Sequence, residues 1–261
     1  LGQDKLVIKL QENVKFHDGS PLDAEAVVWN LKRQVQNPKS FARNYLPQVN
    51  KENPAQAIDP LTVQINMSRP SAAILSSLSD GLGDQQTAIV SKAAAEKNGE
   101  EWLKLNPVGT GPFKFVSFAS GDKLVVEKNP NYWKMGADGK PLPYADKITY
   151  RVIIEASTQF TEMRAGTADW ISNVRGRDVA AAKQIPHANY IESPFNGVKR
   201  QFFFNAAKPP FKDNLKLRLG IQHAIDRDAM AKALGAGLGI PLPYELVPGS
   251  IGYDTSVPFY E

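Results

Sequence analysis

The chain has 261 residues, 42% of them hydrophobic, and its 31 Lys and Arg side chains exceed its 27 Asp and Glu side chains to give a formal net charge of +4. This length and composition predict about two globular domains with a sizeable core. The basic residues are dispersed, in clusters no longer than pairs such as Lys32-Arg33, which argues against nucleic-acid binding. The absence of cysteine excludes disulfides, thiolate nucleophiles and cysteine-based zinc sites, and it fits an exported bacterial protein.

Neither a membrane-spanning helix nor a secretory leader is recognisable in the sequence. No apolar run approaches the roughly 18 residues of a membrane helix, and no secretory leader is present. The sequence opens without Met, in a strand-like run from Leu6 to Leu10. We therefore expect the chain to begin inside a domain and to be an incomplete portion of a longer protein.

The first long helix has a well-marked start. Ser20 is its expected cap, Pro21 suits its first turn, and Asp23 completes a capping box. Apolar residues then recur at helical spacing, which predicts one buried face: Val27, Val28, Leu31 and Val35.

After residue 147, predicted strands and helices alternate, which is typical of an α/β domain. The other predicted elements, in chain order, are strands at 6–16 and 61–67, helices at 74–78 and 91–98 (the second ending at Gly99), a hairpin over 113–126 that turns at 119–122, a strand at 147–154, a helix at 157–165 closed by Gly166, a strand at 168–172, a helix at 176–185, strands at 189–192 and 199–205, and a helix pair from 213 to 236 in which Asp226 caps the second helix.

The sequence shows no pattern typical of an enzyme active site. His17-Asp18 could be an acid–base pair, but a polar turn in which Asp18 bonds the backbone before Gly19 is the better interpretation. The three histidines form no His-x-x-x-His pair, and the turn at 109–111 lacks the Lys-Ser/Thr of a phosphate loop. Residues 235–239 follow a predicted helix, whereas a dinucleotide-binding loop follows a strand. We therefore expect no enzymatic activity, no cofactor and no metal.

The aromatic residues near two predicted strands have two possible interpretations. Trp170 ends a predicted strand, and Phe202, Phe203 and Phe204 are consecutive. Alternate side chains of a strand face opposite ways, so at least one of these Phe residues leaves the core that holds its neighbours. Either this strand is central and buried on both faces, or the aromatic side chains form a wall of a ligand cleft.

Four blocks of sequence together resemble one protein family. They are residues 10–25 (LQENVKFHDGSPLDAE), residues 107–133 (PVGTGPFKFVSFASGDKLVVEKNPNYW), residues 163–169 (MRAGTAD), and residues 209–227, which contain PPFKD, LR and AIDR. Their content, order and spacing are similar to the extracytoplasmic solute-binding proteins of ABC importers, family 5, which bind peptides or nickel. One departure is Ala26, where the family often carries Asp.

The resemblance implies an α/β, type II periplasmic-binding-protein fold with mixed sheets and flanking helices, here the incomplete middle portion of a two-lobed receptor that closes by hinge motion. Residues 1–106 would be part of the accessory subdomain of the first lobe. Residues 107–198 would be the main part of that lobe, and residues 199–261 would cross the hinge into a truncated second lobe.

The resemblance also implies where ligand would bind, by motif position. The expected cleft residues are Tyr45 from the accessory subdomain, Ser172, Asn173 and Val174 after the third block, and Arg200, Phe202 and Phe204 on the crossing strand. In this hypothesis Asn173 hydrogen-bonds ligand amides, Arg200 pairs with a carboxylate, and Phe202 stacks on the ligand.

The expected function is capture of a peptide or similar small polar solute outside the cytoplasmic membrane and delivery to ABC permease membrane subunits. The location would be periplasmic or at the cell surface, and the complete protein a monomer. A ligand-sensing receptor without transport, or a hydrolase, remains an alternative. Because the family's anchor for a peptide amino group lies beyond the position of residue 261, we expect this chain alone to bind ligand weakly or not at all, and to expose apolar surface along 199–211 that drives self-association.

Overall fold

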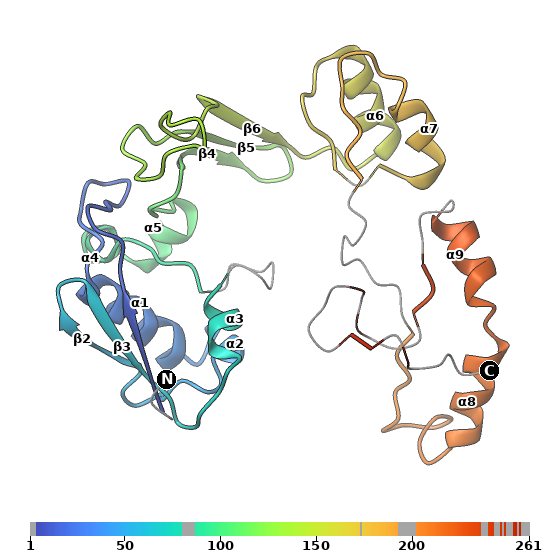
Figure 1. Cartoon of the computed structure of the whole chain (residues 1–261), viewed down its shortest axis with the longest axis horizontal. Helices are drawn as coiled ribbons and strands as arrows, with labels where there is room; N and C mark the ends of the chain where they lie inside the picture. Colours follow the sequence, from blue (N-terminus) through green and yellow to red (C-terminus); the bar gives the residue numbers. More distant parts are fainter. Residues whose placement is uncertain are drawn as a thin grey trace. The chain divides into compact units, whose positions relative to one another are not determined.

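The chain forms two compact units, residues 1–152 and 153–261. The structure is a computed structural model (Figure 1). It describes residues 4–79, 87–172, 174–192, 202–235 and 240–242 and the single positions 246, 248, 253, 254 and 256. None of the helices in these ranges is long and apolar enough to cross a membrane.

The first unit is built on a three-stranded antiparallel sheet in the order β1-β3-β2. Its strands are β1 (Lys5–Lys9), β2 (Ala55–Asp59) and β3 (Thr62–Asn66). Val63 and Ile65 are buried, whereas Gln64 between them is half-exposed, because successive strand side chains point to opposite faces. The strand predicted at 61–67 is thereby confirmed.

Helix α1 (Ala24–Gln36) covers the buried face of this sheet. Its apolar stripe packs on β2 and β3 to form the main core, whose buried members are Leu6, Ala24, Val28, Leu31, Val35, Leu46, Val49, Ala55, Val63, Ile65, Met67 and Ile74. The predicted cap was wrong by three residues. Asp23 is the N-cap, and its Oδ1 accepts from the Ala26 amide at 2.8 Å, because Ser20 is engaged instead with the Asp18 carboxylate.

The first unit also contains short helices. They are α2 (Ala42–Tyr45), α3 (Ile74–Leu78), α4 (Lys92–Asn98) and α5 (Glu100–Leu105). The expected stop at Gly99 is confirmed: Gly99 has φ of 87° and its amide bonds the Ala95 carbonyl at 2.8 Å. A positive φ costs glycine nothing, so the chain turns there directly into α5.

A second antiparallel sheet follows in the order β4-β5-β6, made of β4 (Phe113–Ala119), β5 (Lys123–Lys128) and β6 (Lys147–Arg151). The predicted hairpin over 113–126 is confirmed, and a register shift lies between Phe115 and Ser117. Phe118, Leu124 and Tyr150 are neighbours across the three strands, and Phe118 and Tyr150 are exposed. One face of this sheet is therefore apolar.

The regular elements of the second unit, within the described residues, are all helical. It contains α6 (Ala156–Ala165), the 3-10 turn η2 (Gly176–Asp178), α7 (Val179–Ala182), α8 (Leu215–Ala224) and α9 (Arg227–Gly235). The stop at Gly166, in left-handed conformation, is confirmed. So is the capping role of Asp226, whose Oδ1 accepts from the Ala229 amide at 2.8 Å.

The strands predicted at 168–172 and 189–192 and the described part of 199–205 do not form. A strand exists only where a neighbour satisfies its N–H and C=O groups, and no described segment of this unit supplies one. The predicted helix at 176–185 is also shorter than expected, ending at Ala182.

The cap of α1 can be tested by mutation. We expect Asp23→Ala to lower the free energy of unfolding by about 1 kcal/mol, because it leaves the Ala26 amide without its acceptor. Glu25→Ala, in the exposed first turn of the same helix, is the matched control and should cost only a few tenths of a kcal/mol. Urea denaturation of both variants is the measurement, and equal losses would contradict Asp23 as the cap.

Candidate functional site

The ring of His17 is fixed by the backbone of the turn at 109–111. Its Nε2 lies 3.0 Å from the carbonyl oxygen of Gly111, and its Nδ1 accepts from the Gly109 amide at 3.4 Å. The His17 amide donates to the Gly109 carbonyl at 2.9 Å. Since Nδ1 accepts, the proton lies on Nε2, which donates to Gly111. The histidine thus serves as a structural bridge between two segments that lie 92 or more positions apart in sequence.

Asp18 turns away from His17 and accepts three hydrogen bonds. Its Oδ1 receives the Ser20 amide at 3.0 Å and the Ser20 hydroxyl at 2.6 Å, and its Oδ2 receives the Ser91 hydroxyl at 2.6 Å. Burial alone would raise the pKa of Asp18, but these bonds from Ser20 and Ser91 outweigh it and hold the pKa below its ordinary value. The polar-turn interpretation of His17-Asp18 is confirmed.

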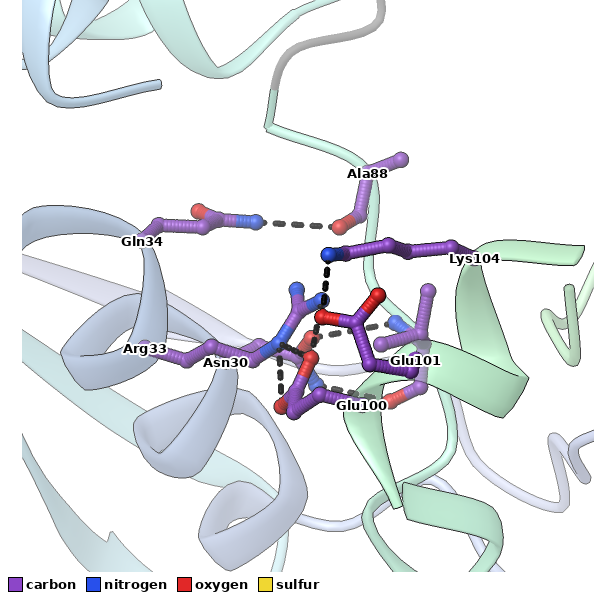
Figure 2. A network of polar contacts seen from close by, with 8 residues as sticks. Asn30, Arg33, Gln34, Ala88, Glu100, Glu101 and Lys104 are labelled. Carbon is purple, nitrogen blue, oxygen red and sulfur yellow. Dashed lines mark hydrogen bonds and ion pairs between the residues drawn. The ribbon is translucent and has the colours of Figure 1, made fainter. Parts of the chain in front are cut away.

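Helix α1 holds a second polar network, shown in Figure 2. The side-chain amide of Asn30 bonds both backbone groups of Val90: its Nδ2 donates to the Val90 carbonyl at 2.8 Å, and its Oδ1 accepts from the Val90 amide at 3.1 Å. One turn later, Gln34 donates through Nε2 to the Ala88 carbonyl at 2.9 Å. Both side chains are buried. They therefore anchor the extended segment 88–90 along the helix.

The same helix is tied to α5 by an ion pair. Arg33 makes a bidentate contact with Glu100, with its Nε 2.8 Å from each carboxylate oxygen (Figure 2). The hydrogen bond from Arg33 lowers the pKa of Glu100 and outweighs the opposing effect of burial. Lys104 pairs with Glu101 beside it. The Arg33–Glu100 pair stabilises the packing of the two helices, whereas the Lys104–Glu101 pair lies within α5.

Within the described ranges, no group of three or more His, Asp or Glu side chains could hold a metal ion. Two of the three histidines bond backbone carbonyls: His17 as above, and His187, whose Nε2 lies 2.9 Å from the Met163 oxygen. The third, His223, is exposed near the end of α8. Neither His17 nor His187 lies beside a serine or a carboxylate partner in these contacts. The described polar clusters can therefore hold segments of chain together, but they do not form a nucleophile–base pair.

The expected ligand residues fall in both units. Tyr45 is the last residue of α2 in the first unit and is half-buried. In the second unit, Ser172 is exposed and Val174 half-buried in the irregular segment between α6 and η2. Trp170, just before them, is 73% exposed. Asn173 lies outside the described residues, so its predicted role is untested by the structure.

The three consecutive phenylalanines have different surroundings. Phe204 packs on Phe211, with ring centroids 5.1 Å apart and planes tilted by 47°. Phe202 and Phe203 are 69% and 83% exposed. The exposed apolar surface predicted near 199–211 is confirmed for these two residues. Arg200 lies outside the described residues, and all seven assignments stay predictions.

A comparison with protein families decides the identity of the fold. The model of the bacterial extracellular solute-binding proteins, family 5 (middle), matches residues 2–261. The chain belongs to this family. Among the curated relatives is the glutathione-binding protein GsiB of Pectobacterium atrosepticum, 32% identical over 248 residues, which are 94% of this chain and 45% of GsiB. The chain thus spans about half the length of the curated relatives it matches.

Two solved structures match nearly the full length of the chain. The periplasmic binding protein DppA of Helicobacter pylori, in complex with the peptide STSA, has a TM-score of 0.81 at 24% identity, covering 99% of this chain and 52% of DppA. AgaA of A. tumefaciens R10, in complex with agropinic acid, has a TM-score of 0.72 at 26% identity, covering 98% of this chain and 49% of AgaA. The predicted family and the predicted α/β, type II binding-protein fold are confirmed.

In this family-5 chain, two of the four recognised blocks contact each other. His17 belongs to the block 10–25, and Gly109 and Gly111 belong to the block 107–133. Sequence reasoning missed Asn30 and Gln34. Their signal was two carboxamides four residues apart among the buried apolar positions of α1, a placement that requires polar partners.

The carboxylate of Asp18 gives the first unit an acid-sensitive element. Because its folded pKa is lowered, its stabilising contribution is present at neutral pH and is lost as pH falls below about 4, through the folded pKa. We expect Asp18→Asn to lower the free energy of unfolding by about 1 kcal/mol at pH 7, a modest value because the side chain is exposed.

Urea denaturation at pH 7 and at pH 3 measures this effect, with Glu12→Gln, an exposed side chain outside the cluster, as control. The difference between the wild-type chain and Asp18→Asn should shrink at the lower pH. A difference that is the same at both pH values would show that the lost stability does not come from the charge of Asp18.

Proposed function

We propose that this chain is part of a ligand receptor of an ABC importer, which captures a small peptide outside the cytoplasmic membrane and delivers it to permease subunits by closing its lobes. The observation that carries the proposal is the family match over residues 2–261. Function is then binding and closure, with no covalent chemistry. The polar clusters of His17, Asp18 and Asn30 support this, since they hold chain segments and offer no reactive pair.

The proposed ligand class is a short peptide, and glutathione is the first compound to test. GsiB, the relative at 32% identity, is a glutathione-binding protein. Glutathione is a tripeptide with two carboxylates and two amides, so a receptor for it needs cationic and hydrogen-bonding side chains. In this proposal Arg200 supplies the cation, and Ser172 and Asn173 supply hydrogen bonds.

The aromatic part of the proposed site is Phe202. It is exposed, whereas Phe204 has a partner in Phe211. An exposed aromatic ring is costly to leave in water and is typical of a surface that ligand or another segment covers. Val174 and Tyr45 complete the proposed lining, Tyr45 from the accessory subdomain.

The proposed organisation follows the family fold. Residues 1–106 form part of the accessory subdomain of the first lobe, residues 107–198 the main part of that lobe, and residues 199–261 the crossing into the second lobe. We infer that the protein acts in the periplasm or at the cell surface, as a monomer that docks on the membrane subunits of its transporter and has no role with nucleic acids.

The neighbouring phenylalanines allow a matched test of the proposed cleft. In a protein extended to the length of the curated relatives, we expect Phe202→Ala to weaken glutathione or peptide binding by roughly 3- to 10-fold, the effect of losing one aromatic contact. Phe203→Ala, which removes an equally large exposed ring one position along, should leave affinity unchanged, because adjacent side chains of an extended segment face opposite ways.

Isothermal titration calorimetry with glutathione and a library of short peptides measures both affinities. If neither glutathione nor any peptide binds, the proposed ligand class is wrong. If Phe203→Ala weakens binding and Phe202→Ala does not, the ligand class stands and the assignment of the cleft-facing side chain is wrong.

A further inference from the structure

The outward face of the first sheet carries a cavity that has no part in the proposed cleft. Since Val63 and Ile65 of β3 face α1, Gln64 and Asn66 face away from the core. The register places Gln56 of β2 beside Gln64. A shallow cavity of about 300 Å³ lies on this face, at the lower limit of volumes that hold small ligands. We call it the amide-lined depression, because Asn50, Asn53, Gln56, Gln64 and Asn66 line it.

Hydrogen bonds fix several of these carboxamides. Asn66 donates through Nδ2 to the Asn53 carbonyl at 3.0 Å, and its Oδ1 accepts from Gln64 Nε2 at 2.8 Å. Asn50 accepts through Oδ1 from the amides of Glu52 and Asn53 at 2.9 and 3.1 Å. Side chains held in this way lose little conformational entropy when a ligand binds.

These bonds leave both donors and acceptors for a ligand. Within the described part of the chain, no partner engages Gln64 Oε1, the Nδ2 group of Asn50 or either end of the Gln56 amide. The free groups thus include an acceptor, a donor and one side chain that offers both. A ligand that fits them must itself donate and accept hydrogen bonds at short intervals.

Charge and polarity narrow the ligand class. Asp4 and Lys5 both line the depression, and their opposite charges disfavour a ligand of either net charge. Met67, the apolar lining residue, is buried. A peptide main chain is usually bound along the edge of a sheet, whereas Gln64 and Asn66 lie on the face of the central strand. Hydroxyl groups, which donate and accept at once, match carboxamides on such a face.

We propose that the amide-lined depression is a second binding site of this protein, for neutral, hydroxyl-rich ligands of the oligosaccharide class. With no aromatic ring among its lining residues, it binds through hydrogen bonds that replace those to water, so affinity is in the millimolar range. The site uses none of the residues of the proposed peptide cleft, so either proposal can fail without the other.

Side-chain amide signals of the nitrogen-15-labelled chain report directly on this site. On titration with maltotriose and with triacetylchitotriose, we expect the NH₂ signals of Gln56, Gln64 and Asn50 to shift for at least one of the two sugars, with a Kd of about 1–10 mM. The double variant Gln56→Ala/Gln64→Ala should weaken binding about tenfold or more, the effect of losing two hydrogen bonds. Gln11→Ala, which removes an exposed carboxamide outside the depression, should bind like the wild-type chain.

Three results would overturn the proposal. The first is that neither sugar shifts these signals at concentrations of about ten times the expected Kd. The second is that the double variant, with an unchanged circular dichroism spectrum, binds as well as the wild-type chain. The third is that trialanine shifts the same signals at lower concentration than either sugar, which would assign the depression to peptides.

Discussion

The turn at 107–112 presents a backbone constraint on which the first unit depends. Its two prolines lack an N–H group, and its glycines have no side chains, so the polar groups of the turn cannot all be satisfied locally. His17 supplies the missing partners, since it contacts the backbone of both Gly109 and Gly111. Asn129 adds a further bond, from Nδ2 to the Gly111 carbonyl at 3.1 Å. The start of the chain, the turn and the second sheet are thereby joined in one network.

Side-chain amides and a carboxylate hold other segments of this unit in a similar way. Asn30 and Gln34 extend from α1 to bond segment 88–90, and Asp18 bonds Ser91 at the start of α4. Asn30 and Gln34 each supply a partner to backbone groups of the irregular segment 88–90. Such networks hold segments rigidly against the apolar core of α1 and its sheet. A rigid body of this kind is compatible with the lobe closure proposed above.

In the described part of the second unit, the predicted helices form but the predicted strands do not. Its helices are formed by local bonds and caps, as at Asp226 and Gly166. The described residues of the segments predicted as strands remain unpaired, because a strand needs a neighbour to satisfy its backbone. Phe202 and Phe203 are exposed for a related reason: no described element of this unit packs on them, whereas Phe204 finds Phe211.

The sequence alone determined the features that depend on short-range chemistry. Glycines at 99 and 166 stop helices because they tolerate positive φ, alternation reveals β3, and the four blocks identify the family. It also indicated correctly that His17-Asp18 is a turn. Only the tertiary structure decided features that depend on residues distant in sequence: that His17 contacts Gly111, that Asp18 accepts from Ser91, and that Asn30 meets Val90. Local sequence patterns determine a residue's own conformation. The partner that bonds its polar group or packs on its aromatic ring depends on how the whole chain folds.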